Sequence, residues 1–178
     1  MDNPKECPFY LVDPSWEASF SDTKTIVDYI RKLPKNDPPL VQPIISPRFA
    51  MSCTSDLLTA LGKYADENPS LRIQTHYAEN LGEVERTLEL FRAKSYADVY
   101  NNFHLLRRNT ILGHGVHVTD HELRLIREKG AGIAHCPSSN FFLRSGSAPI
   151  GHYLDMGVKV HSTLSSRAQR QRRYHRWV

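Results

Sequence analysis

The 178-residue chain is predicted to have an α/β fold in which about five parallel strands alternate with helices. Three short apolar runs each end in a histidine, at His76, His114 and His135, and a helix-like segment follows each run. Parallel βα units place the C-terminal ends of their strands on one face of the fold. The three imidazoles are therefore expected to lie near one another at one edge of a sheet.

Chain length limits the form that this fold can take. With 40% hydrophobic residues the chain can bury one core, but a complete eight-stranded βα barrel typically takes about 250 residues. The expected strands centre near residues 45, 74, 112, 133 and 159. This spacing fits five βα repeats, so either a barrel lacks three strands at its front or the fold is not a barrel.

The first 40 residues are expected to contain a single helix. Three prolines within residues 1–20 exclude a long helix there. Ser21 and Asp22 form a helix N-terminal signal, which predicts a helix over residues 23–33 that Pro34 ends.

Residues 41–46 indicate the first strand, with Arg48 and Phe49 in the loop at its C-terminal end. A guanidinium beside an aromatic ring suits a planar heterocycle that carries a carbonyl group, because arginine donates hydrogen bonds and phenylalanine stacks. The alternative is an exposed arginine beside a core phenylalanine, and the residues alone favour it. Residues 55–67 predict the helix that follows.

The strand predicted over residues 73–78 places His76 at its end and Glu79 where the chain leaves the sheet. An imidazole there suits zinc or iron, and a nearby carboxylate that is not a ligand can move protons for an activated water. One such pair is common by chance. The further histidines at equivalent strand ends make a shared metal site the favoured interpretation.

The second half continues the alternation. Residues 81–91 predict a helix whose charged side chains, including Glu83, face solvent, and residues 95–106 predict a more ambiguous aromatic helix with a packing role. Residues 119–122 form a capping box that opens the next helix. A last helix is predicted over residues 149–156.

Other polar groups near the strand ends have two interpretations. The loop expected over residues 137–140 offers groups that either bond a ligand or cap a turn, and the sequence favours neither. His117 and His121 suit a loop and a first helical turn, although His117 is close enough to His114 to reach the cleft. The last strand is predicted over residues 158–160.

Charge and cysteine content exclude several classes of function. The net charge is +4, but residues 165–178 hold five arginines and no acid, so the remainder carries −1. We expect a domain over residues 1–164 and a disordered basic tail over residues 165–178, with no nucleic-acid partner; an RNA-binding tail is the alternative. The three cysteines form no CxxC pair and are expected to be free. No run suits a membrane helix or a signal peptide, so a cytoplasmic location is the default expectation.

Four short motifs resemble those of the guanine deaminase family, in the metal-dependent amidohydrolase superfamily. They are Pro47-Arg48-Phe49, Gln74-Thr75-His76 with Glu79-Asn80, Gly113-His114-Gly115, and Ala134-His135-Cys136-Pro137 with Ser139-Asn140. The similarity runs from about residue 41 to residue 160, and more faintly from residue 1. It implies a TIM-type (β/α)8 barrel, here incomplete.

The resemblance also implies roles for single residues. The metal ligands would be His76 and His114, the proton shuttle Glu79, and the substrate-binding residues Arg48, Phe49 and His135. One Zn²⁺ per subunit would activate a water that attacks the carbon bearing the exocyclic amine of guanine. Xanthine and ammonia would be the products, and complete relatives would be homodimers.

Two departures from this pattern put activity in doubt. The family's His-x-His ligand pair is absent, so we expect the chain to start after that motif, and no aspartate follows Asp155 to supply the last ligand. Only two of four protein ligands are then expected, and the chain is expected to be incomplete as a catalyst. The alternatives are an inactive fragment that binds zinc or a partner through exposed barrel edges, or another deaminase or chlorohydrolase of the superfamily.

Overall fold

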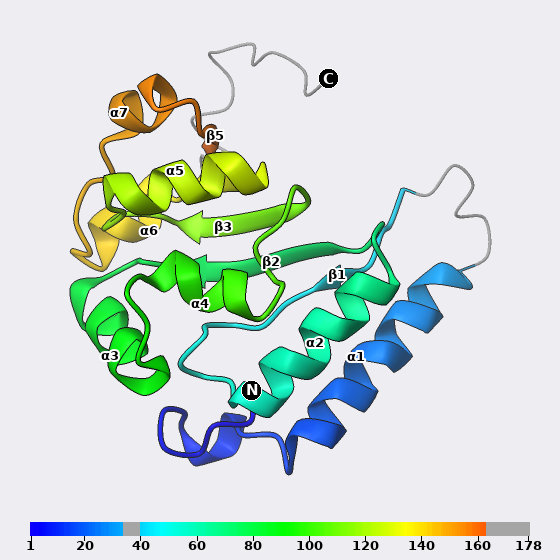
Figure 1. Ribbon diagram of the computed structural model, residues 1–178. Coiled ribbons are helices and arrows are strands. Elements are labelled where there is room, and N and C mark those ends of the chain that lie inside the picture. The colour runs from blue at the N-terminus through cyan, green and yellow to red at the C-terminus, as the bar shows by residue number, and fades with distance from the viewer. Residues whose placement is uncertain (34–39, 163–178) are drawn as a thin grey trace.

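The computed structural model describes residues 1–33 and 40–162 and contains a five-stranded parallel sheet (Figure 1). The strands are β1 (Ile44–Ile45), β2 (Arg72–Tyr77), β3 (Thr110–His114), β4 (Gly132–His135) and β5 (Lys159–Ser162), paired in chain order. The α-helices are α1 (Trp16–Arg31), α2 (Ser55–Glu67), α3 (Leu81–Phe91), α4 (Tyr96–Asn102), α5 (Asp120–Lys129), α6 (Pro137–Phe142) and α7 (Ile150–Asp155), and a 3₁₀ helix η1 covers Phe9–Leu11.

Parallel pairing of the three histidine-ending segments is confirmed. In the register, His76 lies opposite Gly113 and Tyr77 opposite His114, while Gly113 lies opposite Ala134. Sequential strand order with right-handed crossovers places the connecting helices on one face of the sheet, as Figure 1 shows. All strands therefore end toward the same edge, which is the arrangement of part of a βα barrel.

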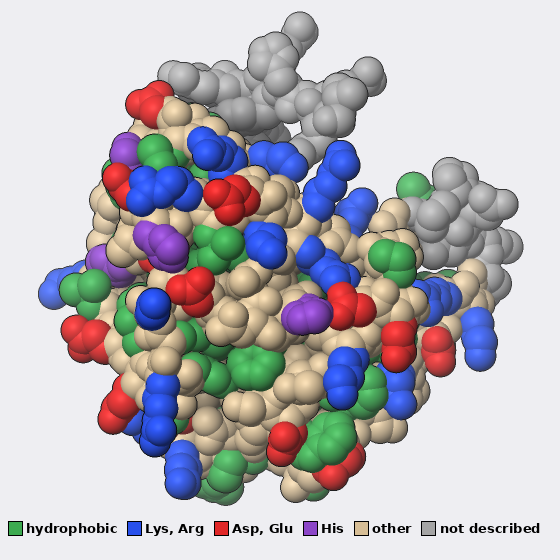
Figure 2. Space-filling model, in the orientation of Figure 1, with side chains coloured by type: hydrophobic (Ala, Val, Ile, Leu, Met, Phe, Trp, Pro, Cys, Tyr) green, Lys and Arg blue, Asp and Glu red, His purple; other side chains and the backbone are tan. Residues whose placement is uncertain are grey.

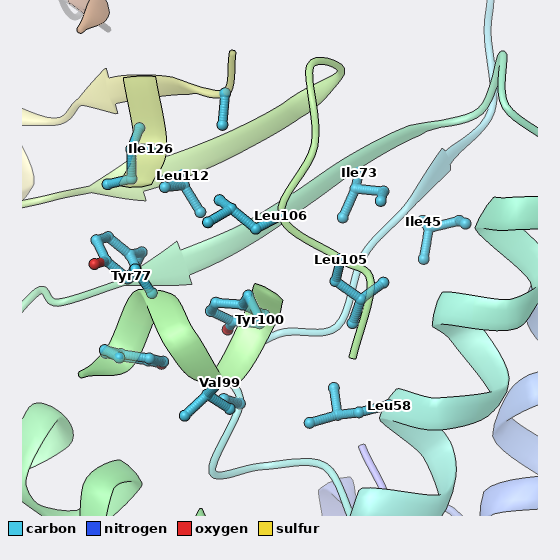
Figure 3. Close-up of a cluster of buried hydrophobic side chains, with 14 of the residues drawn as sticks. Ile45, Leu58, Ile73, Tyr77, Val99, Tyr100, Leu105, Leu106, Leu112 and Ile126 are labelled. Atoms are coloured by element: carbon cyan, nitrogen blue, oxygen red, sulfur yellow. The ribbon is translucent and has the colours of Figure 1, made fainter. Parts of the chain in front are cut away.

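The core lies between this helical layer and the sheet (Figure 3). Ile73 and Leu112 project from adjacent strands toward Leu58 of α2 and Tyr100 of α4, and all four are at most 1% exposed. The helix predictions over residues 55–67 and 81–91 are confirmed to the residue, because each has a polar N-cap and an apolar stripe.

Two predictions near the N-terminus are wrong. The helix α1 begins at Trp16, inside the stretch expected to be irregular, because Ser15 accepts a hydrogen bond from the Ala18 N–H and acts as the N-cap. Pro14 precedes the helix and therefore does not interrupt it. The predicted strand over residues 41–46 contracts to the two residues of β1.

Two predictions in the second half also need correction. The segment 137–140, expected to be a loop, opens α6, since Pro137 at the first helical position is compatible with helical backbone. The aromatic helix α4 ends at Asn102, and His104 then adopts a positive φ of 60°, so residues 103–106 leave the helix. The capping box of α5, formed by Thr119 and Glu122, is confirmed.

One buried carboxylate joins three elements on the side of the sheet that the helices cover. Glu122 Oε1 accepts hydrogen bonds from the Tyr77 hydroxyl at 2.8 Å and from the backbone N–H groups of Tyr96 and Ala97 at 3.0 and 3.2 Å. Its Oε2 accepts from the N–H and hydroxyl of Thr119, both at 2.9 Å. Glu122 is 3% exposed, so it links β2, α4 and α5 where water does not reach.

The face shown in Figure 2 carries both acidic and basic side chains. No helix in the described ranges is long and apolar enough to span a membrane. The tail predicted over residues 165–178, and the domain boundary beside it, lie outside the described residues.

Candidate active site at the C-terminal strand ends

Two imidazoles lie face to face where β2 and β3 end. The ring centroids of His76 and His114 are 5.3 Å apart and their planes differ by 20°. The expectation that these two imidazoles lie near each other at one edge of the sheet is confirmed. In the register His76 lies opposite Gly113 and His114 opposite Tyr77, so the two residues are one position apart on neighbouring strands, which are about 5 Å apart.

A backbone carbonyl fixes the proton of His76. The Arg48 carbonyl oxygen accepts the His76 backbone N–H at 3.0 Å and lies 2.8 Å from the His76 Nδ1. Because a carbonyl oxygen only accepts, Nδ1 carries the proton and Nε2 presents a lone pair. Burial lowers the pKa of His76, which also favours the neutral ring that a metal needs.

His114 is held in an uncommon backbone conformation. Its φ is +71°, in the left-handed region that β-carbon-bearing residues seldom adopt, and it is 6% exposed. Its Nδ1 lies 2.8 Å from the Asn140 Oδ1 and 3.2 Å from the Glu79 Oε1. Strain of this kind is concentrated at functional sites, where surrounding contacts hold it in place.

Glu79 is buried beside His114 and retains acceptor capacity. It follows Ala78, whose φ of +48° turns the chain out of the sheet, and only 7% of it is exposed. Apart from the His114 contact, its Oε1 has no hydrogen-bond partner within the described part of the chain. A buried carboxylate with a free oxygen is suited to take and return a proton.

A second carboxylate supports Glu79, and its expected position was wrong. Glu83 was expected to face solvent but is 5% exposed, and its Oε2 accepts the Glu79 backbone N–H at 2.9 Å. The N-cap Asn80 accepts the Glu83 N–H through its side chain. The spacing of Asn80 and Glu83 is that of a capping box, so this sequence signal could have placed Glu83 correctly.

Replacing Glu83 by glutamine is expected to change how stability depends on pH. Burial raises the pKa of the Glu83 carboxyl above its ordinary value of 4.5. Wild-type stability from this group is therefore fully present below pH 4.5 and is lost as pH rises through the raised pKa. Urea unfolding from pH 4 to 8 should show that the free energy of unfolding of Glu83→Gln increases relative to that of wild type as pH rises. The control is Glu85→Gln, which changes an exposed glutamate on the same helix and should show no such increase. A stability difference between Glu83→Gln and wild type that does not change with pH would contradict this account.

Arg48 and Phe49 extend the row of rings outward. The Phe49 ring stacks on His76 with centroids 4.5 Å apart and planes 24° apart, and the Arg48 guanidinium carbon lies 5.6 Å from the Phe49 ring centroid. Arg48 is exposed and Phe49 is half-buried in the loop after β1. A planar ligand at this edge would meet an aromatic face and a cation together.

Two further histidines belong to these strand ends: His135 ends β4, and His117 follows β3. The residue before His135, Ala134, lies opposite Gly113, and burial followed by the charge of His114 lowers the pKa of His135. His117 instead donates from Nε2 to the Ser145 carbonyl at 2.8 Å, so it has the structural role of a loop residue.

The donor set only partly fits a metal ion. Both ring Nδ1 atoms face oxygen acceptors, so His76 and His114 can offer Nε2 as two ligands. In residues 1–33 and 40–162, however, no group of three or more His, Cys, Asp or Glu side chains is placed to hold a metal. Catalytic zinc normally has three protein ligands, so the described residues supply an incomplete set.

The sequence profile of the amidohydrolase family matches residues 6–170. The chain belongs to the amidohydrolase family. It is 44% identical over 155 residues to a probable guanine deaminase of Schizosaccharomyces pombe, covering 86% of this chain and 29% of that protein. It is 45% identical over 157 residues to the guanine deaminase of Dictyostelium discoideum, covering 88% and 34%.

Two solved structures share the fold of this chain. The guanine deaminase of C. acetobutylicum, with guanine bound in its active site, superposes with a TM-score of 0.83 at 35% identity, covering 91% of this chain and 37% of that one. A triazine hydrolase variant gives a TM-score of 0.81 at 20% identity, which shows a shared fold alone. This amidohydrolase chain thus spans about a third of the length of the relatives it matches.

Proposed function

We propose that the whole protein is a zinc-dependent guanine deaminase that hydrolyses guanine to xanthine and ammonia. The observation that carries the proposal is the meeting of His76, His114 and Glu79 at one strand edge, with Arg48 and Phe49 beside them. The identity of 44–45% to guanine deaminases supports guanine as the substrate. Purine catabolism in the cytoplasm and a homodimeric complete enzyme are part of the same proposal.

Each residue has a definite task in this reaction. Arg48 donates hydrogen bonds to the carbonyl oxygen and a ring nitrogen of guanine, while Phe49 packs against the base and His135 lies beside it. Glu79 accepts a proton from the attacking water at Oε1 and passes it to the departing exocyclic nitrogen. His76 and His114 would hold the metal through Nε2, and zinc bound there would supply Lewis-acid activation of the water.

Metal binding gives the first test of these assignments. Zinc binding to the 178-residue chain, measured by equilibrium dialysis, is expected to be weak and to disappear in His76→Ala, because one imidazole alone holds zinc poorly. His121→Ala is the matched control, since this side chain is 61% exposed and 3.7 Å from Asp98. Unchanged zinc binding in His76→Ala would remove His76 from the ligand set.

The function itself is tested by exchanging segments. Residues 41–160 of this chain would replace the corresponding segment of the Dictyostelium discoideum guanine deaminase, and the rest of that enzyme is expected to supply the missing ligands. The chimera is expected to release ammonia from guanine at within about tenfold of the parent, whereas the 178-residue chain with zinc should fall far below about 1 s⁻¹.

The other outcomes separate the alternatives. One such outcome is a folded, zinc-loaded chimera that fails to turn over guanine but hydrolyses another aminated or chlorinated heterocycle. That result would contradict the proposal and assign a different amidohydrolase activity to this chain. A chimera that binds zinc and turns over no such substrate would favour a binding role for this chain. Turnover by the 178-residue chain near about 1 s⁻¹ would show that its own residues suffice for catalysis.

A further inference from the structure

Asn140 is a buried amide that contacts His114 from the neighbouring βα unit. Its side chain is on α6, it is 1% exposed, and its Oδ1 lies 2.8 Å from the His114 Nδ1. The backbone of Asn140 is fixed at both ends, because its N–H donates to the Cys136 carbonyl at 3.0 Å and its carbonyl accepts the Ser145 N–H at 2.9 Å. The amide is therefore held in a defined place by helix α6 and the turn after it.

The side chain of Asn140 is not used to cap a helix. The N-cap of α6 is Cys136, whose side chain makes no capping hydrogen bond, and Asn140 lies inside the helix. Its Nδ2 has no hydrogen-bond partner among the described residues. Burying an amide costs free energy unless hydrogen bonds inside the protein offset the loss of water. The hydrogen bond to His114 is the contact that offsets the burial of the Asn140 side chain.

Two oxygens compete for the His114 Nδ1, and they differ in charge and distance. Asn140 Oδ1 is at 2.8 Å, within normal hydrogen-bond length, whereas Glu79 Oε1 is at 3.2 Å. An amide oxygen can only accept, so it holds a proton on Nδ1 and leaves Nε2 with a lone pair. Because Asn140 takes the shorter bond, Glu79 is not needed to orient the ring and its Oε1 stays available for a proton.

A second contact fixes the two units relative to each other. His117 lies three residues after His114, and its Nε2 donates a hydrogen bond at 2.8 Å to the carbonyl of Ser145, in the turn after α6. The end of β3 and the loop after it are thereby joined to α6 and to the turn after α6 by one hydrogen bond each. The orientation of the His114 ring is consequently set from outside its own βα unit.

We propose that Asn140 is a positioning residue that keeps the His114 proton on Nδ1 and so presents Nε2 to the metal, leaving Glu79 free for proton transfer. This inference rests on the proposed function for the metal role of His114. Groups that orient a ligand from behind typically change metal affinity by about 10–100-fold when they are removed.

The test reads the ring nitrogen directly and needs no turnover. Long-range ¹H–¹⁵N NMR of histidine-labelled 178-residue chain at pH 8 is expected to show His114 with its proton on Nδ1. In Asn140→Leu, which is similar in size and lacks the acceptor, the proton should move toward Nε2 and zinc affinity should fall by about 10–100-fold. Asn140→Asp retains an acceptor and should keep the Nδ1 proton and zinc binding within about tenfold.

Asn102→Leu is the matched control, because this asparagine is exposed at the end of α4, and it should change neither measurement. Wild-type His114 with its proton on Nε2 would overturn the proposal, and this measurement requires no variant to fold. Asn140→Leu with an unchanged ring proton and unchanged zinc affinity would overturn it as well. If the ring proton follows residue 140 while the guanine deaminase chimera carrying Asn140→Leu binds zinc as tightly as the unchanged chimera, the positioning role stands and the metal role of His114 fails.

Discussion

Replacing Glu122 by alanine is expected to lower the free energy of unfolding by about 3–5 kcal/mol, because the change leaves several buried donors without an acceptor. The carboxylate accepts five hydrogen bonds, from the Tyr77 hydroxyl, the N–H groups of Tyr96 and Ala97, and the N–H and hydroxyl of Thr119. Urea unfolding at pH 7, followed by circular dichroism, measures the difference.

The controls for this prediction lie on the same helix. Glu128→Ala changes an exposed carboxylate on α5 and should shift stability by less than about 0.5 kcal/mol. Glu122→Gln keeps an acceptor oxygen for some of the five donors, so its cost should be intermediate. A Glu122→Ala variant as stable as Glu128→Ala would show that the network contributes little to the fold.

Replacing Glu79 by glutamine in the active chimera is expected to lower kcat for guanine by about 10²–10⁴-fold, the usual contribution of a positioned proton-transfer group. Glutamine keeps the size of the side chain but cannot take a proton at Oε1. Because Glu79 is proposed to lie outside the ligand set, zinc content should stay the same. Initial rates of ammonia release, with zinc measured on the same samples, provide the comparison.

Glu85→Gln serves as the matched change for Glu79→Gln, since this glutamate is exposed on α3 and should leave kcat unaltered. Loss of zinc together with activity in Glu79→Gln would make Glu79 a ligand and remove its separate role in proton transfer. Full activity with bound zinc would assign the proton transfer to another group.

The sheet and its histidine edge could be predicted from sequence because their signals are local. Each run ending at His76, His114 or His135 carries its own apolar pattern, and parallel βα geometry then brings the ends together. The boundaries of α2 and α3 were likewise predictable, since a polar cap and an apolar stripe lie within a dozen residues.

The residues that support the site could not be predicted in the same way. Asn140 contacts His114 across 26 residues of sequence, and nothing near Asn140 indicates which ring it faces. The burial of Glu83 depends on its bond to the Glu79 backbone and on packing around α3, although its capping-box spacing was visible. In α1, a single cap at Ser15 outweighed the preceding proline, which a count of prolines does not register.

The chain-order pairing of the sheet also bears on how the protein folds. Each strand finds its partner in the adjacent βα unit, so every pairing closes a loop of only one unit. The entropic cost of closing a loop grows with its length, and folds rich in short-range contacts form faster than those that join distant segments. The sheet can therefore grow strand by strand while the chain is still being synthesised, each new unit docking on an edge that already exists.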